Sequence, residues 1–292
     1  MKRREFLHTA AYGVGAAWLG SKLTARAFAL PELTQKFTAS DTVVLGSTGI
    51  QTSRLAMGTG TSGVWHHSHQ TALGLKGLSD LLLNGYDHGL RFFDTADGYG
   101  SHPHVAEALK HVPREKVTIM TKSDTRDPAG MRADLDRYRK ELGTDYIDIL
   151  LIHCVTEGDW TERYKGIMDV LSEAKQKGVI RTHGCSCHSI EALRAAAASP
   201  WVEIDLARIN PVGAYTDADP NTVVSVLKQM KASGKAVLGM KILGAGKLRH
   251  KVDESLQFAL SLDCVDCFTI GSESRAEMLD LVNKIPAASV RG

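Results

Sequence analysis

The sequence predicts an α/β fold, a TIM (β/α)8 barrel with an N-terminal β-hairpin. Three observations lead to this prediction. After about residue 40, short runs of apolar and β-branched residues alternate with amphipathic stretches, as strands and helices do around a parallel sheet. Eight such pairs follow one another. They occupy a chain of about 263 residues once the first 29 are set aside, which is the usual size of this barrel.

The predicted strands are short apolar runs that mostly end in a polar residue or a glycine. In order they are 54–58, 91–95, 117–121, 146–153, 180–185, 204–210, 236–240 and 267–271. Each is followed by a stretch with apolar residues three to four positions apart, which is typical of a helix packed on one face. These helices are predicted at 70–84, 103–110, 129–142, 161–177, 190–198, 221–231, 252–262 and 274–284.

A hairpin is predicted just before the first barrel strand. Residues 42–53 form two short runs around a Ser-Thr-Gly turn. We expect this hairpin to close the N-terminal mouth of the barrel.

The first 29 residues differ from the rest of the chain. Lys2-Arg3-Arg4 is followed by a weakly apolar, glycine-containing stretch and then by Ala27-Phe28-Ala29, the layout of a cleavable export signal. The paired arginines resemble the twin-arginine form of such signals. We therefore expect residues 1–29 to be a signal peptide, 30–40 a linker and 41–292 the barrel, with the mature protein in the periplasm or otherwise exported. The alternatives are an N-terminal helix that stays attached and an uncleaved membrane tether.

Charge limits the partners that the mature chain can have. Residues 1–29 hold five of the 35 basic residues and one of the 33 acidic ones, so that 30 basic and 32 acidic residues remain and the net charge changes from +2 to −2. No basic excess is left for nucleic acid or an anionic membrane surface. The expected partner is the twin-arginine export machinery, and we expect no stable membrane anchor.

Five cysteines are too few for a disulfide scaffold. Cys264 and Cys267 form a CxxC motif, but no second ligand pair and no redox motif accompany it. An exported protein could still carry one bridge, and the sequence leaves open whether these two cysteines form it.

Three consecutive predicted strands end in or directly before a polar side chain. Asp94, Lys122 and His153 occupy these ends, and Tyr99 follows Asp94 by five residues. In such a barrel the active site is built at the carboxyl ends of the strands. Each residue alone has a structural explanation, such as a helix cap or a solvated charge. Together they suit carbonyl reduction, because a phenol with a pKa of about 10 needs a nearby cation to release its proton.

The motifs around these residues resemble those of the aldo-keto reductase family. The run DTADGY from Asp94 to Tyr99 resembles its catalytic signature, DILLIH ending at His153 its fourth-strand motif, and LGSTG with GTG at Gly58 its opening. The resemblance extends in order from about residue 43 to 283. It implies an NAD(P)-dependent oxidoreductase for an aldehyde, ketone or sugar-like carbonyl, whose expected partner is a small carbonyl or alcohol substrate. Tyr99 would be its general acid and base, tuned by Lys122 and Asp94, and His153 would orient the carbonyl.

Two late loops are predicted to bind the cofactor. Glycine lets a backbone approach a pyrophosphate closely, and helix N-termini offer free N–H groups. By the resemblance, the loops after the seventh and eighth strands take this role, together with the end of the fifth. The candidate cofactor residues are Ser186, Cys187, Met240, Lys241, Leu243, Gly244, Gly246, Gly271, Ser272 and Glu273.

Several of these residues depart from the family pattern. Cys187 stands where an asparagine usually binds the nicotinamide carboxamide, Met240 where an aromatic ring is frequent, and Lys241 where a small hydroxyl residue is common. Glu273 offers a carboxylate instead of a lysine for a 2′-phosphate, and a carboxylate favours a free ribose hydroxyl. The expected cofactor is therefore NADP(H) or NAD(H).

The loop after the first strand contains Trp65 and His66, which we expect to line the substrate pocket. Further histidines lie nearby, but no carboxylate or cysteine completes a ligand set, so no metal is expected.

A second function class remains open, namely a non-catalytic exported barrel with a binding or regulatory role. Its basis is that an exported protein meets little free nicotinamide cofactor. The twin-arginine route carries proteins that fold and bind cofactor before crossing, so we expect a tightly held cofactor. A tyrosine beside a buried cation favours the enzyme.

Overall fold

Eight parallel strands form a closed barrel in this computed structural model, which describes residues 36–289. Their order around the barrel is β10-β3-β4-β5-β6-β7-β8-β9. The strands are β3 (Leu55–Gly58), β4 (Phe92–Asp94), β5 (Thr118–Ser123), β6 (Ile147–Val155), β7 (Ile180–Cys187), β8 (Ile204–Arg208), β9 (Ala236–Met240) and β10 (Cys267–Gly271). The predicted TIM barrel is confirmed, and each predicted strand coincides with one of these. The expected signal peptide and the linker up to residue 35 lie outside the described residues.

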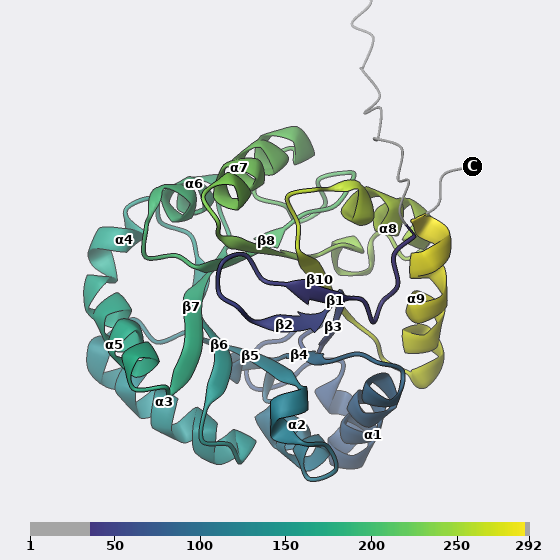
Figure 1. Cartoon of the computed structure of the whole chain (residues 1–292), viewed down its shortest axis with the longest axis horizontal. Coiled ribbons are helices and arrows are strands. Elements are labelled where there is room, and N and C mark those ends of the chain that lie inside the picture. The colour runs from purple at the N-terminus through teal and green to yellow at the C-terminus, as the bar shows by residue number, and fades with distance from the viewer. Residues whose placement is uncertain (1–35, 290–292) are drawn as a thin grey trace, which may run out of the picture. The chain divides into compact units, whose positions relative to one another are not determined.

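Helices surround the barrel (Figure 1). They are α1 (Gly74–Asp87), α2 (His102–Leu109), α3 (Pro128–Leu142), α4 (Trp160–Arg163), α5 (Lys165–Gln176), α6 (Ile190–Ala198), α7 (Pro220–Ala232), α8 (Val252–Ser261) and α9 (Arg275–Ala288). No helix within residues 36–289 combines the length and the apolar character that crossing a membrane requires.

The predicted helix 161–177 is divided into α4 and α5, with a break at Tyr164. The break allows α4 to turn Trp160 into the core, where it is fully buried and its Nε1 donates a hydrogen bond to the Ala192 carbonyl at 3.2 Å. Amphipathic spacing alone does not show such a break, because both segments keep apolar residues on their inner face.

The predicted hairpin is present as β1 (Thr42–Val44) paired with β2 (Gln51–Ser53). Figure 1 shows these two strands lying across one end of the barrel. Leu45 and Ile50, in the turn between them, are buried in one cluster with barrel residues such as Phe92 and Leu238. The turn is also joined to the segment before β9 by a hydrogen bond from the Ser47 N–H to the Gly234 carbonyl at 2.9 Å. The hairpin thus closes the N-terminal mouth.

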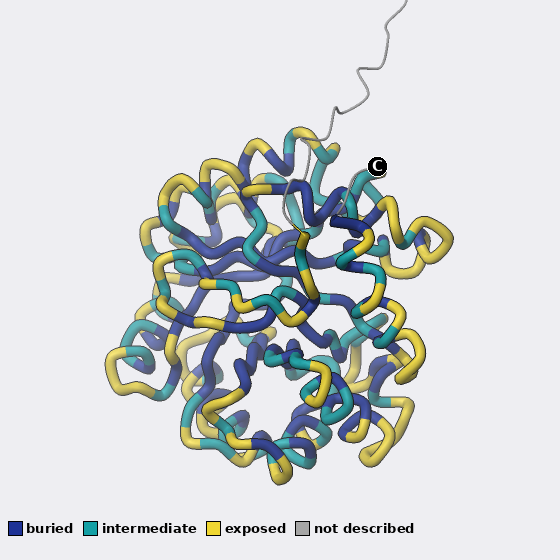
Figure 2. The backbone as a smooth tube through the Cα atoms, turned by 45° about the vertical axis from the view of Figure 1, so that its right-hand side comes forward, coloured by how far each residue is buried: buried dark blue, intermediate teal, exposed yellow. Residues whose placement is uncertain are grey.

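The barrel interior changes from apolar to polar along the strands. Side chains two positions apart on a strand face the same side. Phe92, Met120 and Leu151 lie in the core inside the barrel, so the residue two positions after each of them also faces inward. Those residues are Asp94, Lys122 and His153. Figure 2 shows the barrel strands buried under a more exposed outer layer. Strand periodicity therefore brings the three polar groups together at the carboxyl end of the barrel, above an apolar floor.

Candidate active site

A buried ion pair lies at the centre of the carboxyl end. Lys122 is fully buried on β5, and its Nζ donates hydrogen bonds to Asp94 Oδ1 at 2.5 Å and to the Thr95 carbonyl at 2.8 Å. Thr269 on β10 donates to the other Asp94 oxygen at 2.8 Å. Burial by itself would lower the pKa of Lys122, but the charge of Asp94 and the neighbouring Tyr99 outweigh it, and the pKa is raised. Lys122 is therefore positively charged at neutral pH.

Tyr99 lies beside this cation, in the single-turn segment η2 (Asp97–Tyr99). Lys122 Nζ is 4.8 Å from the centre of the tyrosine ring. Burial raises the pKa of the Tyr99 phenol to about 12, although the charge of Lys122 acts in the opposite direction. The phenol is thus protonated at neutral pH and adjacent to a cation that can stabilise its anion.

Two glycines after β3 make room for the tyrosine ring. A Cβ atom at Gly60 would lie 2.2 Å from Tyr99 Cε2, and one at Gly63 would lie 2.3 Å from Tyr99 Cδ1. Neither distance is compatible with a side chain unless the ring moves. These glycines are required for space, since neither has a positive φ.

A cluster of charged side chains fixes η2 from the outside. Arg137 of α3 binds both carboxylate oxygens of Asp97, at 2.7 and 2.8 Å, and also contacts Asp134 and Glu141. On the other side, the His66 N–H donates to the Gly98 carbonyl at 2.9 Å. Bidentate arginine-carboxylate pairs restrict orientation as well as distance. The segment that carries Tyr99 is thereby held between α3 and the loop after β3.

His153 completes the set on β6. Its ring is nearly buried, 5.7 Å from the Tyr99 ring in an edge-on arrangement, and its Nδ1 lies 3.0 Å from Asp124 Oδ1. The next residue, Cys154, has a φ of +51°, and the pairing of β6 with β7 shifts register at this point. Its thiol sulfur lies 3.7 Å from His188 Nε2. Bulges of this kind redirect side chains next to functional sites.

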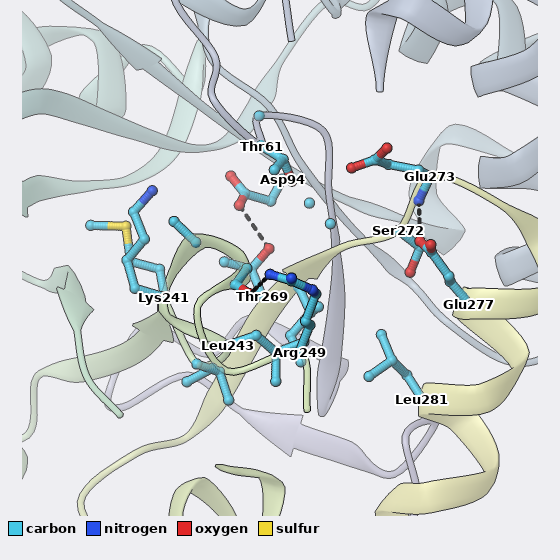
Figure 3. Close-up of a pocket in the computed structure, with 18 of the residues that line it drawn as sticks. Thr61, Asp94, Lys241, Leu243, Arg249, Thr269, Ser272, Glu273, Glu277 and Leu281 are labelled. Atoms are coloured by element: carbon cyan, nitrogen blue, oxygen red, sulfur yellow. Dashed lines mark hydrogen bonds between the residues drawn. The ribbon is translucent and has the colours of Figure 1, made fainter. Parts of the chain in front are cut away.

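The predicted tetrad therefore comes together: Asp94, Tyr99, Lys122 and His153 lie at one end of the barrel. A pocket opens from Asp94 and Tyr99 and extends over the loops after β9 and β10 (Figure 3). Of the predicted cofactor residues, Met240, Lys241, Leu243, Gly246, Gly271, Ser272 and Glu273 line it. Gly244 belongs to the single-turn segment η4 (Gly244–Gly246), between two of these residues.

Several features of this pocket fit a nicotinamide dinucleotide. The Ser186 hydroxyl lies outside the lining of the pocket; it is fully buried at the end of β7 and has no hydrogen-bond partner within residues 36–289, so that its hydrogen-bonding capacity is open to a carboxamide. Ala245 and Gly246 line the pocket with positive φ angles, and the glycine lets the backbone approach a pyrophosphate closely. Ser274 caps the start of α9, so that a helix N-terminus also lies beside the pocket.

The far end of the pocket is acidic. Glu273, Glu277 and Asp280 line it, and the first two are labelled in Figure 3. Glu277 accepts a hydrogen bond from the Glu273 N–H at 2.7 Å, and the Glu273 carboxylate lies 2.8 Å from His69 Nδ1 in the loop after β3. Arg249 also lines the pocket, with its guanidinium next to the Gly246 carbonyl at 3.3 Å.

Cys187 lies away from the pocket. Because Ser186 faces the barrel mouth, the next side chain on the strand faces the helices. The Cys187 sulfur lies 3.7 Å from that of Cys185, and Cys185 donates to Asp205 Oδ1 at 3.3 Å in a fully buried cluster. Burial raises the pKa of Asp205 to about 7 and that of the Cys187 thiol well above its usual value.

Trp65 and His66 lie at the rim of the site, outside the lining of this pocket. Trp65 is 89% exposed, and both residues have positive φ angles. His66 Nδ1 lies 3.0 Å from the Asp97 carbonyl oxygen, so its contact is with η2.

Sequence reasoning missed Thr269, the space-making role of Gly60 and Gly63, and Arg137. For Thr269 a signal was present, since it is the polar residue on the inner face of an otherwise apolar strand. The contacts of the glycines and of Arg137 join segments far apart in the sequence and carry no local pattern.

Comparison with known families agrees with this geometry. The family model described as "Aldo/keto reductase family" matches residues 54–283, which is most of the chain. The chain belongs to this family. Solved aldo-keto reductases share its fold: one described as putative, from Pseudomonas aeruginosa, has a TM-score of 0.71 at 21% identity over 88% of this chain and 99% of that one.

Curated aldo-keto reductase relatives match over shorter segments. An NADH-specific methylglyoxal reductase of Escherichia coli is 28% identical over 170 residues, 49% of this chain and 51% of the relative. A D-threo-aldose 1-dehydrogenase of a Pseudomonas species is 23% identical over 211 residues, 59% of this chain and 63% of the relative. The matched segments span about half to two thirds of the length of these curated relatives.

Proposed function

We propose that this aldo-keto reductase family member is an NAD(P)-dependent oxidoreductase that reduces the carbonyl group of an aldehyde, ketone or sugar-like compound. The observation that carries the proposal is the position of Tyr99, a protonated phenol beside the buried Lys122–Asp94 pair. It lines a pocket that extends over the loops after β9 and β10. A barrel that only binds ligands has no need of a buried cation beside a tyrosine.

The residues of the chain handle the proton. A nicotinamide cofactor, when bound, supplies the hydride that adds to the carbonyl carbon. Tyr99 donates its proton to the carbonyl oxygen, and Lys122 stabilises the phenolate that remains. Asp94 neutralises Lys122 in the absence of the phenolate and so keeps the burial of that cation tolerable. His153, edge-on to the Tyr99 ring, hydrogen-bonds the same carbonyl oxygen and sets its angle.

For the cofactor we propose a preference for NAD(H) over NADP(H). The 2′-phosphate of NADP(H) would enter the acidic end of the pocket, where Glu273, Glu277 and Asp280 repel it. A carboxylate instead accepts hydrogen bonds from the free ribose hydroxyls of NAD(H). Arg249 lies next to Gly246, in the loop that would receive the pyrophosphate.

Replacement of Tyr99 by phenylalanine tests the proposal. General acids contribute about 10²–10⁴-fold to rate, so Tyr99→Phe should lower carbonyl reduction by at least about 100-fold. NADH affinity, measured by fluorescence quenching, should change little, because the ring remains and only the hydroxyl is lost. Full-length or mature protein that binds neither NADH nor NADPH, and that reduces no member of a carbonyl panel, would instead support a non-catalytic binding barrel.

We also propose that the protein is exported by the twin-arginine machinery, on the basis of the paired arginines and the Ala-Phe-Ala end of residues 1–29. Replacing Arg3 and Arg4 by lysine should leave the protein in the cytoplasm. Fractionation that finds parent and variant in the same compartment would contradict this proposal.

A further inference from the structure

Cations gather around the carboxyl end of the barrel, and most of them have a partner there. Lys122 is paired with Asp94, as described above. Arg208, at the end of β8, is hydrogen-bonded to the buried carboxylate of Asp217. Arg126 donates to the His153 carbonyl and to the Thr125 carbonyl at 3.2 Å.

Lys241 differs from these three. It follows β9 directly, and Arg208 lies opposite Met240 in the pairing of β8 with β9, so the two basic residues end neighbouring strands. Its side chain is half-buried and lines the same pocket as Asp94 and Tyr99 (Figure 3). Within residues 36–289 no carboxylate lies within 4.0 Å of its ammonium group, while the other cations of the mouth are held by neighbouring oxygens.

The backbone holds Lys241 in this position. Its φ is +59°, a conformation that side-chain-bearing residues adopt rarely and that persists where the surrounding structure enforces it. Its carbonyl accepts hydrogen bonds from the Gly244 N–H at 2.8 Å and from Asn210 Nδ2 at 3.1 Å. The chain thus fixes the direction in which this lysine leaves the strand.

A half-buried ammonium without a counter-ion is unfavourable in the free protein. Burial, and after it the charge of Arg208, lower the pKa of Lys241. Such a group gains most from a ligand that supplies the missing negative charge.

We infer that the carbonyl substrate of this enzyme carries a carboxylate, which Lys241 binds while Tyr99 and His153 hold the carbonyl oxygen. The substrate class is then that of oxo acids, either aldehydes or ketones with a carboxylate in the same small molecule. This inference rests on the proposed function, because it assigns the charged end of a substrate whose carbonyl end the tetrad receives.

The other anion that enters this pocket is the pyrophosphate of the cofactor. The guanidinium of Arg249, which lines the pocket in the loop after β9, is available to it. Lys241 instead follows β9 directly and lines the same pocket as Asp94 and Tyr99 of the tetrad. If Lys241 binds the substrate, removing its charge should reduce the preference for a carboxylate. If it binds the pyrophosphate, the same change should reduce NADH affinity.

A matched pair of substrates distinguishes these two roles of Lys241. We would compare kcat/KM for 4-carboxybenzaldehyde with that for the neutral 4-formylbenzamide, and in parallel the binding of benzoate and benzamide to NADH-loaded protein by calorimetry. The parent enzyme should favour the carboxylate by about tenfold or more in both measurements, as expected for a charge-assisted contact in a partly buried site. Lys241→Met should bring both ratios close to one, and Lys241→Arg should retain most of the preference.

Lys247→Met serves as the matched control. Lys247 belongs to the same loop, but it is exposed and its Nζ lies 4.4 Å from the centre of the Tyr215 ring at the surface. This variant should keep the parent ratios. Equal ratios in parent and Lys241→Met would overturn the inference, and so would a loss of NADH affinity in Lys241→Met as large as the loss of carboxylate preference. Benzoate preference without any carbonyl turnover would refute the proposed function and leave the carboxylate site standing.

Discussion

A methyl group added at Gly60 tests the geometry of the active site without touching its chemistry. The new Cβ would lie 2.2 Å from Tyr99 Cε2 and 2.4 Å from both Cδ2 and Cζ, whereas ordinary contacts begin at 3.4 Å. The tyrosine ring must therefore move by about 1 Å or more. Gly60 has no positive φ, so alanine adds volume there without backbone strain.

The expected consequence is a large loss of turnover with a moderate loss of stability. A reacting group displaced by about 1 Å costs on the order of 100-fold in rate. Overpacking of a filled site costs about 1–3 kcal/mol in the free energy of unfolding. We therefore expect kcat for carbonyl reduction by Gly60→Ala to fall about 100-fold. NADH affinity should fall much less than kcat, because most of the cofactor pocket belongs to the loops after β9 and β10.

Steady-state kinetics, fluorescence titration with NADH and urea denaturation measure these three quantities. Gly158→Ala is the control, since Gly158 lies in an exposed turn where a Cβ would be 3.3 Å from Glu191 Cβ. The double variant Gly60→Ala/Tyr99→Phe should lose no more activity than Tyr99→Phe alone, because both changes act through the same phenol. A Gly60→Ala enzyme with the kcat of the parent would refute the placement of Tyr99.

Three further predictions follow from buried or acidic side chains. Ser186→Ala should weaken NADH binding by about 3- to 10-fold, the value of one hydrogen bond, while thermal unfolding shifts little because the hydroxyl has no protein partner. Burial raises the pKa of Asp205 to about 7, so the stability supported by its proton is present at acidic pH and is lost as the pH rises through 7. In urea denaturation, the free energy of unfolding of Asp205→Asn relative to the parent should therefore be about 2–3 kcal/mol higher at pH 8 than at pH 5. The same difference at both pH values would show that the ionisation of Asp205 is not the cause. Glu277→Gln should reduce the preference for NADH over NADPH about fivefold in kcat/KM, whereas Glu254→Gln, on the exposed side of α8, should leave it unchanged.

The sequence was sufficient for the fold because two periodicities repeat eight times along the chain. It was also sufficient for the tetrad. On three strands every second residue faces inward, and Asp94, Lys122 and His153 are the next inward-facing residues after the apolar ones. The same rule of alternation would have predicted that Ser186 and Cys187 cannot both face the mouth. A family pattern led instead to the expectation that both bind the cofactor.

The remaining features depend on contacts between distant segments. Gly60 and Gly63 look like ordinary loop glycines until the Tyr99 ring is placed against them. The division of the predicted helix 161–177 depends on the burial of Trp160 against α6, and the exposure of Trp65 depends on positive φ angles in its loop. Local composition records none of these, because each follows from the space that the rest of the barrel leaves.

The hydrogen bond from Thr269 to Asp94 links residues 175 positions apart, and it exists only once β10 has paired with β3. A nascent chain that has produced every member of the tetrad still lacks this donor until the last strand emerges from the ribosome. Until then, one oxygen of the Asp94 carboxylate has no Thr269 hydroxyl to bind. A truncation before β10 would therefore leave the Lys122–Asp94 pair without this donor, however well the earlier strands fold. The strand that closes the barrel also supplies the last hydrogen bond of its charged centre.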